Sequence, residues 1–256
     1  MNLSSIENNL LLAKTRLYNT PEFVATDPVS IPHGYTRKED REVAGFLAAT
    51  LAWGQRVTIL RNCQKLLQPM DGAPYEFVLH ASTAELRPFH SFVHRTFNGQ
   101  DAVCFLLALR HVYRHHGGLE QIFSPLPNDV PDSGSHITRA RNRFFEIAHP
   151  ARSEKHFANP ARGSAAKRIN MFLRWMVRHD EQGVDFGLWK NFPTHQLICP
   201  LDVHSGRVAR KLGLLSRKQD DWTAAVELTQ NLRRIDPIDP VRFDIALFGL
   251  GVFEGF

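Results

Sequence analysis

Apolar residues recur at helical spacing through most of the chain, and alternating strand patterns are scarce. Between Glu39 and Met70 the apolar period changes phase at Gly54, so we expect two helices joined at Trp53–Gly54–Gln55. The same period predicts further helices over 1–20, 74–82, 100–115, 137–149, 164–179, from Asp202 onward, and over 221–234 and 240–251. The pattern therefore predicts an all-α fold without solenoid repeats.

Turn-forming residues interrupt this pattern at two long segments. Residues 21–38 contain three prolines and a glycine, which predicts a loop or an extended connector. Residues 124–136 are rich in Pro, Ser, Asp and Gly, and form the clearest surface loop of the sequence. Ser164 is a candidate N-cap for the helix that follows it.

The composition is that of a globular protein, with 43% hydrophobic and 22% charged residues. No apolar run reaches the roughly 18 residues that predict a membrane span. Residues 1–20 are predicted to be an amphipathic helix rather than a signal peptide. We therefore expect a cytoplasmic protein.

The residues that usually hold metals are widely spaced. Cys63, Cys104 and Cys199 fit neither a zinc knuckle, nor an iron–sulfur cluster, nor a disulfide framework. The histidines at 111, 115 and 116 share a predicted helix, but they lack the carboxylate of an HExxH motif. They are interpreted as surface or phosphate-facing side chains, and no metal and no cofactor are expected.

Positive charge is concentrated in one part of the chain. The net charge is +5, but Arg139 to Lys218 contains 16 Lys and Arg against 6 Asp and Glu, so the remainder is near −5. Such a surplus favours contact with a polyanion, because neutralised phosphates release counterions. The alternative is an ordinary solvated basic surface.

The stretch CPLDVHSGRVARKLGLL, residues 199–215, is the most specific in the sequence. Asp202 stands where a new helix begins, a position that by itself is typical of an N-cap. However, Asp202 with Val203 and His204, followed by Arg207–Val208 and by Arg210–Gly213, resembles a run of the helix-hairpin-helix DNA glycosylases. Endonuclease III and the 8-oxoguanine glycosylases belong to that superfamily.

This resemblance assigns roles to three of these residues. The Asp of the family's run is the catalytic carboxylate, which implies that role for Asp202, with His204 and Arg207 near the DNA. Downstream, LTQNLRRIDP and RFDIALFGLGV are similar to the family's two closing helices.

The resemblance extends to the stretch REVAGFLAATLAWGQRVTILRNCQKLL. It is similar to the family's early helix pair, in which the Gln of the turn enters the duplex beside the flipped nucleotide. The matching residue is Gln55, and its alternative role is that of a helix-capping turn residue. Trp53 could stack on an extruded base, or it could be a core tryptophan.

The segment NPARGSAAKRINMFLRWMVR departs from the family pattern, because the first glycine of the phosphate-gripping hairpin is missing. Arg162, Gly163 and Ser164 could still offer amides and charge at a helix start. Lys167 stands at the family's lysine position, where the amine attacks C1′ and forms a Schiff base. Partial burial or the neighbouring Arg168 would favour loss of its proton. The alternative is one more exposed basic residue.

The 35 residues between Lys167 and Asp202 exceed the usual family spacing. This separation is closest to the archaeal 8-oxoguanine glycosylase branch, and residues 179–198 would form an inserted loop that carries Trp189 and Phe192. The family's cysteine cluster is absent, so no iron–sulfur centre is implied.

Taken as a whole, the resemblance implies a two-lobed all-α glycosylase fold with a DNA cleft between lobes. One lobe would contain residues 40–166, and the other residues 1–39 and 167–256. The implied function is base excision with abasic-site lyase activity, on an oxidised purine such as 8-oxoguanine in double-stranded DNA. A monomer associated with the nucleoid is expected. The alternatives are a non-catalytic DNA- or RNA-binding module and another enzyme that acts on structured RNA.

Overall fold

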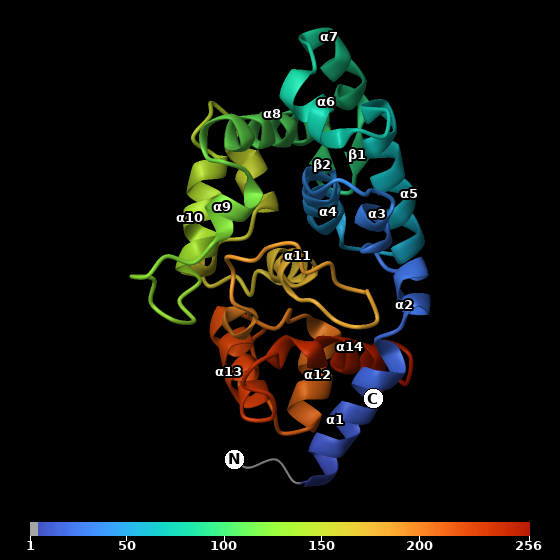
Figure 1. Ribbon diagram of the computed structural model, residues 1–256, viewed down its shortest axis with the longest axis vertical. Helices are drawn as coiled ribbons and strands as arrows, with labels where there is room; N and C mark the ends of the chain where they lie inside the picture. Colours follow the sequence, from blue (N-terminus) through green and yellow to red (C-terminus); the bar gives the residue numbers. More distant parts are fainter. Residues whose placement is uncertain (1–4) are drawn as a thin grey trace. The chain divides into compact units, whose positions relative to one another are not determined.

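The computed structural model describes residues 5–256 and is mostly helical, as the apolar pattern predicts (Figure 1). Within these residues the strands are limited to one short antiparallel hairpin of β1 (Val93–His94) and β2 (Phe97–Asn98). None of the helices in this range is long and apolar enough to cross a membrane.

The chain divides into two compact units, which are described separately. Unit 1 contains the described residues up to Ala25 together with Val130–Gly134 and Asn159–Phe256, and unit 2 contains Thr26–Asp129 and Ser135–Ala158. These bounds differ from the predicted lobes, because residues 26–39 belong with unit 2, and residues 130–134 and 159–166 belong with unit 1.

Local packing explains these differences in the bounds. The short helix α3 (Ser30–His33) packs against α4 (Lys38–Leu51), which holds this part of the connector in unit 2. Gly134 lies so close to Pro160 and the ring of Trp222 that an added Cβ would be 2.6 Å and 2.8 Å from them. The loop tip at Gly134 therefore belongs to unit 1, although it is far from Trp222 in sequence.

Unit 2 is built on α4 and α8 (Gly99–His115). Its other helices and 3₁₀ turns are α3, α5 (Arg56–Leu67), η1 (Gln68–Met70), α6 (Pro74–His80), α7 (Thr83–Leu86), η2 (Arg87–Ser91), α9 (Leu119–Phe123), α10 (Ser135–Phe144) and η3 (Ala151–His156). α4 packs on α5 and α6, and α8 packs on α6 and α10. The predicted helix pair around Gly54 is confirmed as α4 and α5.

Phenylalanine dominates the core of unit 2. Fully buried rings come from Phe46, Phe97, Phe105, Phe123, Phe144 and Phe157. The ring centroids of Phe105 lie 4.9 Å from Phe144 and 5.3 Å from Phe97. Edge-to-face contacts of this kind add to the stability that the burial of apolar area provides.

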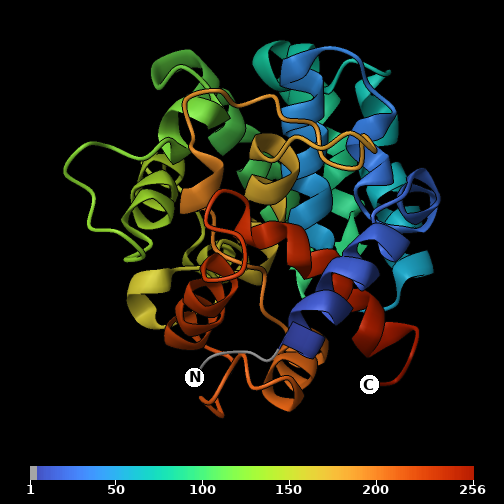
Figure 2. The same ribbon diagram turned by 60° about the horizontal axis from the view of Figure 1, so that its bottom comes forward.

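Unit 1 contains the first and last helices of the described chain. Its elements are α1 (Ser5–Tyr18), α2 (Pro21–Thr26, which ends at the unit boundary), η4 (Pro160–Arg162), α11 (Lys167–Val177), η5 (Thr194–Gln196), α12 (Val203–Lys211), α13 (Trp222–Arg233), η6 (Pro240–Phe243) and α14 (Asp244–Val252). Figures 1 and 2 both show α1 alongside α14. This close approach requires a glycine, because a Cβ on Gly249 would lie 2.2 Å from the Tyr18 ring.

Two buried arginines of α11 organise the core of unit 1. Arg174 and Arg178 are each about 4% exposed. Nε of Arg178 donates to Asp239 at 2.8 Å, and Nη1 donates to Asp185 at 3.0 Å and to Asp180 at 2.5 Å. Buried charges must be paired in this way, since desolvation alone would make them costly.

The segment that follows α11 is a long loop, as expected from the sequence. Between Val177 and Val203 the regular structure is limited to η5. The backbone of this loop follows α11, because the amide of Phe186 donates to Trp175 O at 2.8 Å and that of Trp189 donates to Met176 O at 3.0 Å. The side chain of Trp189 is buried, as is that of Phe192.

Three local predictions need correction or restriction. Residues 21–38 are not an irregular connector, because they contain α2 and α3. The helix expected over 164–179 begins at Lys167, and its N-cap residue is Ala166 rather than Ser164. Of the helix expected over 1–20, the described part runs Ser5–Tyr18, and residues 1–4 lie outside the described residues.

Candidate active site

Lys167 is the first residue of α11, because the chain makes a sharp turn immediately before it. Ala166 has a left-handed backbone with φ 50°, and Ser164 Oγ accepts its amide hydrogen at 3.2 Å. The turn directs α11 away from the preceding 3₁₀ segment. The side chain of Lys167 is 29% exposed, so its amine is within reach of solvent.

Asp202 caps the start of α12. Its Oδ1 accepts hydrogen bonds from the amides of His204 at 2.9 Å and Ser205 at 3.0 Å. In return, Ser205 Oγ accepts the amide hydrogen of Asp202 at 2.9 Å, which completes a capping box. These bonds fix the carboxylate and leave Oδ2 to face another partner.

That partner is Lys167, whose Nζ lies 3.7 Å from Asp202 Oδ2. Two residues that are 35 positions apart in sequence are thus brought together at the starts of two helices. Asp202 is 27% exposed, similar to Lys167, so the pair is partly open to solvent. A screened pair of this kind contributes little to stability by itself.

Asp202 is held in its ionised form. Burial opposes the charge, but the positive charge of Lys167 and the amides of Ser205 and His204 outweigh it and lower the pKa of Asp202. The carboxylate is therefore negative near neutral pH. A fixed negative charge at this position suits stabilisation of a developing cation.

A second acidic group lies behind this pair. Asp244, the first residue of α14, is 7% exposed, and Nη1 of Arg174 donates to its Oδ2. Nε of Arg174 donates to Asp185 at 3.2 Å. Burial raises the pKa of Asp244 to about 6, against the opposing charges of Arg174 and Lys167. The sequence interpretation missed Asp244, because an Asp before an apolar helix resembles an exposed cap.

The amides proposed for gripping phosphate are already used within the protein. Arg162, Gly163 and Ser164 are exposed, as expected. However, the Gly163 amide donates to Pro160 O at 2.8 Å, and the amides of Ser164 and Arg162 donate to Asn159 O at 3.3 Å and 3.1 Å. The segment before α11 is a 3₁₀ turn, so the expected role of these amides is wrong for this conformation.

The other residues expected at the DNA surface of unit 1 have different surroundings. Arg207 donates to Gly251 O in the last turn of α14 and to Phe256 O beyond the helix, both at 3.0 Å. Burial lowers the pKa of Arg168 to about 10. His204 is exposed beside Asp202. Of these three, His204 is best placed to meet a ligand at the pair.

Gln55 and Trp53 belong to unit 2. Gln55 is the N-cap residue of α5, but its exposed side chain makes no capping hydrogen bond. Gln55 thus occupies the capping position of the alternative, without a side-chain cap. Trp53 is half-buried, with its ring 4.7 Å from that of His94 and 6.0 Å from that of His156, centroid to centroid. It packs at the margin of the core.

The basic surplus of residues 139–218 is largely paired internally. Nine of its sixteen cations form ion pairs, among them Arg139 with Asp129 and Arg210 with Asp220. Several acidic partners lie outside the segment, which a count along the sequence cannot reveal. The surplus in space is therefore smaller than a count along the sequence indicates.

Comparison with known proteins places the chain in a family. Residues 27–253 match the family described as "Protein of unknown function (DUF2400)", and the chain belongs to it. Searches of curated proteins and of solved structures give no significant match.

Proposed function

We propose that this protein is a DNA base-excision glycosylase with abasic-site lyase activity, built on a helix-hairpin-helix glycosylase fold. The observation that carries the proposal is the 3.7 Å approach of Lys167 Nζ to Asp202 Oδ2. The catalytic lysine and carboxylate implied by the sequence resemblance are neighbours in space, although 35 residues separate them.

The pair has the chemistry that the reaction needs. The unprotonated amine of Lys167 attacks C1′ of the damaged nucleotide, the glycosidic bond breaks, and its electrons and a proton go to the leaving base. Asp202 stabilises the positive charge that develops on the sugar. The nitrogen then loses a proton, and the C1′–O4′ bond breaks with its electrons and a proton going to O4′, which gives a Schiff base. Loss of a proton from C2′ expels the 3′ phosphate and cleaves the strand.

The proposal also names the substrate and requires its damaged nucleotide to leave the duplex. An oxidised purine such as 8-oxoguanine in double-stranded DNA is the proposed substrate, and the enzyme is proposed to act as a monomer. The nucleotide must leave the stack before its C1′ is accessible, which costs a few kcal/mol. The exposed Gln55 is proposed to fill the space that the nucleotide leaves in the duplex.

Borohydride trapping tests the proposal. Duplexes that carry an abasic site, 8-oxoguanine opposite C or A, or no lesion would be incubated with wild type, Lys167→Ala, Asp202→Asn and Lys218→Ala. Lys218 is an exposed lysine of the same unit and serves as the control. We expect a covalent adduct with wild type and Lys218→Ala, and none with Lys167→Ala.

Asp202→Asn separates base expulsion from the lyase step. Because Asp202 acts while the base leaves, we expect about a 100-fold loss on the lesion duplex and a smaller loss on the abasic duplex, which has no base to expel. Equal losses on both substrates would contradict this role.

A non-catalytic nucleic-acid-binding module is the second candidate. The internally bonded amides of Arg162, Gly163 and Ser164 favour it, because they depart from a phosphate-gripping hairpin. Measurable duplex binding without any adduct or cleavage would select this candidate.

A further inference from the structure

A second cluster of reactive side chains lies in unit 2, at the end of α8. His111 is in the last part of this helix, and His116 is its C-cap residue. Residues five positions apart do not share a helix face. They come together here because the helix ends at His116, whose backbone is not helical (φ −127°, ψ 11°).

Two glycines make this helix end possible. Gly117 and Gly118 have φ values of 72° and 97°, which favour glycine. The Gly118 amide donates to Val112 O at 3.3 Å and so closes the helix end. A Cβ at Gly118 would lie 2.9 Å from the ring of Tyr113. The sequence thus turns His116 back toward His111.

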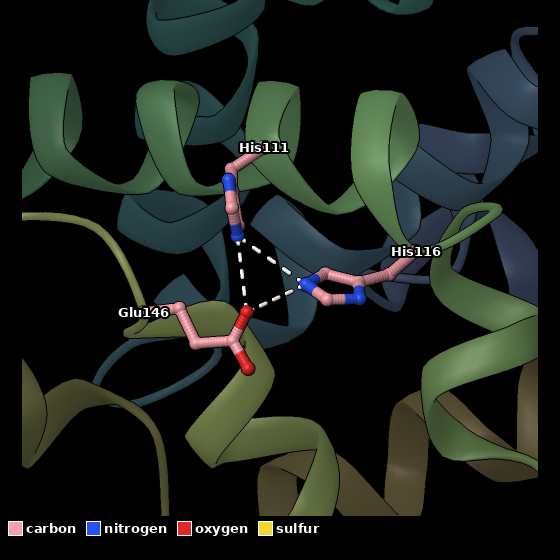
Figure 3. Close-up of side chains that lie close together, drawn as sticks. All are labelled: His111, His116 and Glu146. Carbon is pink, nitrogen blue, oxygen red and sulfur yellow. Dashed lines mark hydrogen bonds and ion pairs between the residues drawn. The ribbon is translucent and has the colours of Figure 1, made fainter.

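The carboxylate that the sequence pattern lacked comes from beyond α10. Glu146 Oε2 lies 3.2 Å from His111 Nε2 and 2.7 Å from His116 Nε2, and the two Nε2 atoms are 3.3 Å apart (Figure 3). Arg143 donates to the other carboxylate oxygen, Oε1, at 2.8 Å, which keeps Oε2 turned toward the imidazoles.

We propose that His111, His116 and Glu146 bind one divalent transition-metal ion, for which Zn²⁺ is the best match. Two imidazole nitrogens and one carboxylate oxygen are ligands that zinc prefers. In a tetrahedral site with bonds of about 2.0–2.1 Å, ligand atoms are about 3.3 Å apart. Two of the three separations already match, and the His116–Glu146 pair must open by roughly 0.6 Å.

The surroundings of the cluster favour a cation. The carbonyl end of α8 carries partial negative charge. The side chains of His111 and His116 are 23% and 17% exposed. Solvent therefore reaches both imidazoles.

A metal at this site would join the end of α8 to the segment after α10. Both belong to unit 2, so the ion would stabilise that unit by mass action on the native state. The site shares no residue with the proposed base excision, whose reacting residues Lys167 and Asp202 belong to unit 1.

The test is zinc binding by the full-length chain after treatment with a chelator. Competition with a chromophoric chelator would measure affinity and stoichiometry for wild type, His111→Ala, His116→Ala and Glu146→Gln. His115→Ala is the matched control, since His115 is exposed on the same helix end and lies outside the trio. Metal-free circular dichroism would verify that each variant folds.

We expect one zinc per wild-type chain, unchanged binding by His115→Ala, and affinity at least about tenfold weaker for each trio variant. Zinc should also raise the unfolding temperature of wild type but not of Glu146→Gln. The proposal is overturned if wild type binds only weakly at several of its thirteen histidines, or if the trio variants bind as wild type does.

Discussion

The cores of the two units differ in the side chains that they bury. Unit 2 buries charged groups too, among them Asp101, but its largest buried side chains are six phenylalanines. In unit 1, Arg174 and Arg178 of α11 lie in the core. Their hydrogen-bond partners there are Asp180, Asp185, Asp239 and Asp244. Unit 1 also buries large rings, among them Trp175 and Trp189, so the contrast lies in the charge pairs that α11 adds to its core.

This difference bears on the candidate site. Apolar contacts tolerate small shifts, whereas a buried arginine needs each partner at a defined position. Arg174 lies two turns after Lys167 on α11, and its partner Asp244 starts α14. The charge pairs therefore fix the helix that presents Lys167, and they place a buried acid within electrostatic range of Lys167 and Asp202.

The largest expected effect comes from breaking the pairs of unit 1. Arg174→Ala leaves Asp185 and Asp244 without their shared cation, which should lower the free energy of unfolding by about 3–5 kcal/mol. Urea unfolding would measure it. Arg217→Ala breaks an exposed pair with Asp221 and should cost at most about 1 kcal/mol. Equal losses of unfolding free energy in the two variants would contradict a special role for the buried pairs.

A cavity in unit 2 should cost a similar amount for a different reason. Phe105→Ala removes a fully buried ring, and we expect a loss of about 3–5 kcal/mol from lost burial and an unfilled cavity. Hydrogen exchange would locate the loss, with faster exchange centred on α4, α8 and α10. Exchange that accelerates mainly around α11 would contradict separate cores.

The buried Asp244 should make the stability of unit 1 depend on pH. The pKa of Asp244 is raised to about 6 in the folded state, so the native protein binds more protons than the unfolded chain between pH 3.8 and about 6. Stability from this group is present at low pH and is lost as the pH rises through about 6.

We therefore expect wild type to lose roughly 2 kcal/mol relative to Asp244→Asn between about pH 4 and pH 7. Urea unfolding of both proteins across this range is the measurement. A difference that grows in favour of wild type with pH would mean that Arg174 outweighs burial.

The smallest expected change in stability distinguishes the helix-capping role of Asp202 from its proposed catalytic role. Asp202→Ala removes the cap of α12 and should cost about 1 kcal/mol, whereas Asp202→Asn keeps a capping oxygen and should cost only a few tenths. Thermal unfolding would measure both. If Asp202→Asn were as destabilised as Asp202→Ala, a loss of activity in that variant would not distinguish catalysis from folding.

Local signals explain what the sequence predicted well. The phase change at Gly54 defined α4 and α5, and Asp202 stood correctly at the start of α12. Helical periodicity and capping depend on residues a few positions apart, so they are visible in one sequence. The approach of Lys167 to Asp202 also agrees with the resemblance, although their catalytic role remains a prediction.

Features that depend on distant partners were not predictable. Arg174 and Asp244 sit in apolar stretches, and their pairing appears only when α11 meets α14. Glu146 contacts His116 and His111, which lie 30 and 35 positions earlier in the sequence. No local sequence motif records a contact between residues so far apart.

The central claim is that Lys167 forms the covalent intermediate, and mapping that bond tests it most directly. Wild type would be trapped with borohydride on an abasic duplex, the DNA digested, and the modified peptide identified by mass spectrometry. We predict a reduced deoxyribose adduct on Lys167. An adduct on any other amine, or no adduct at all, would contradict the account.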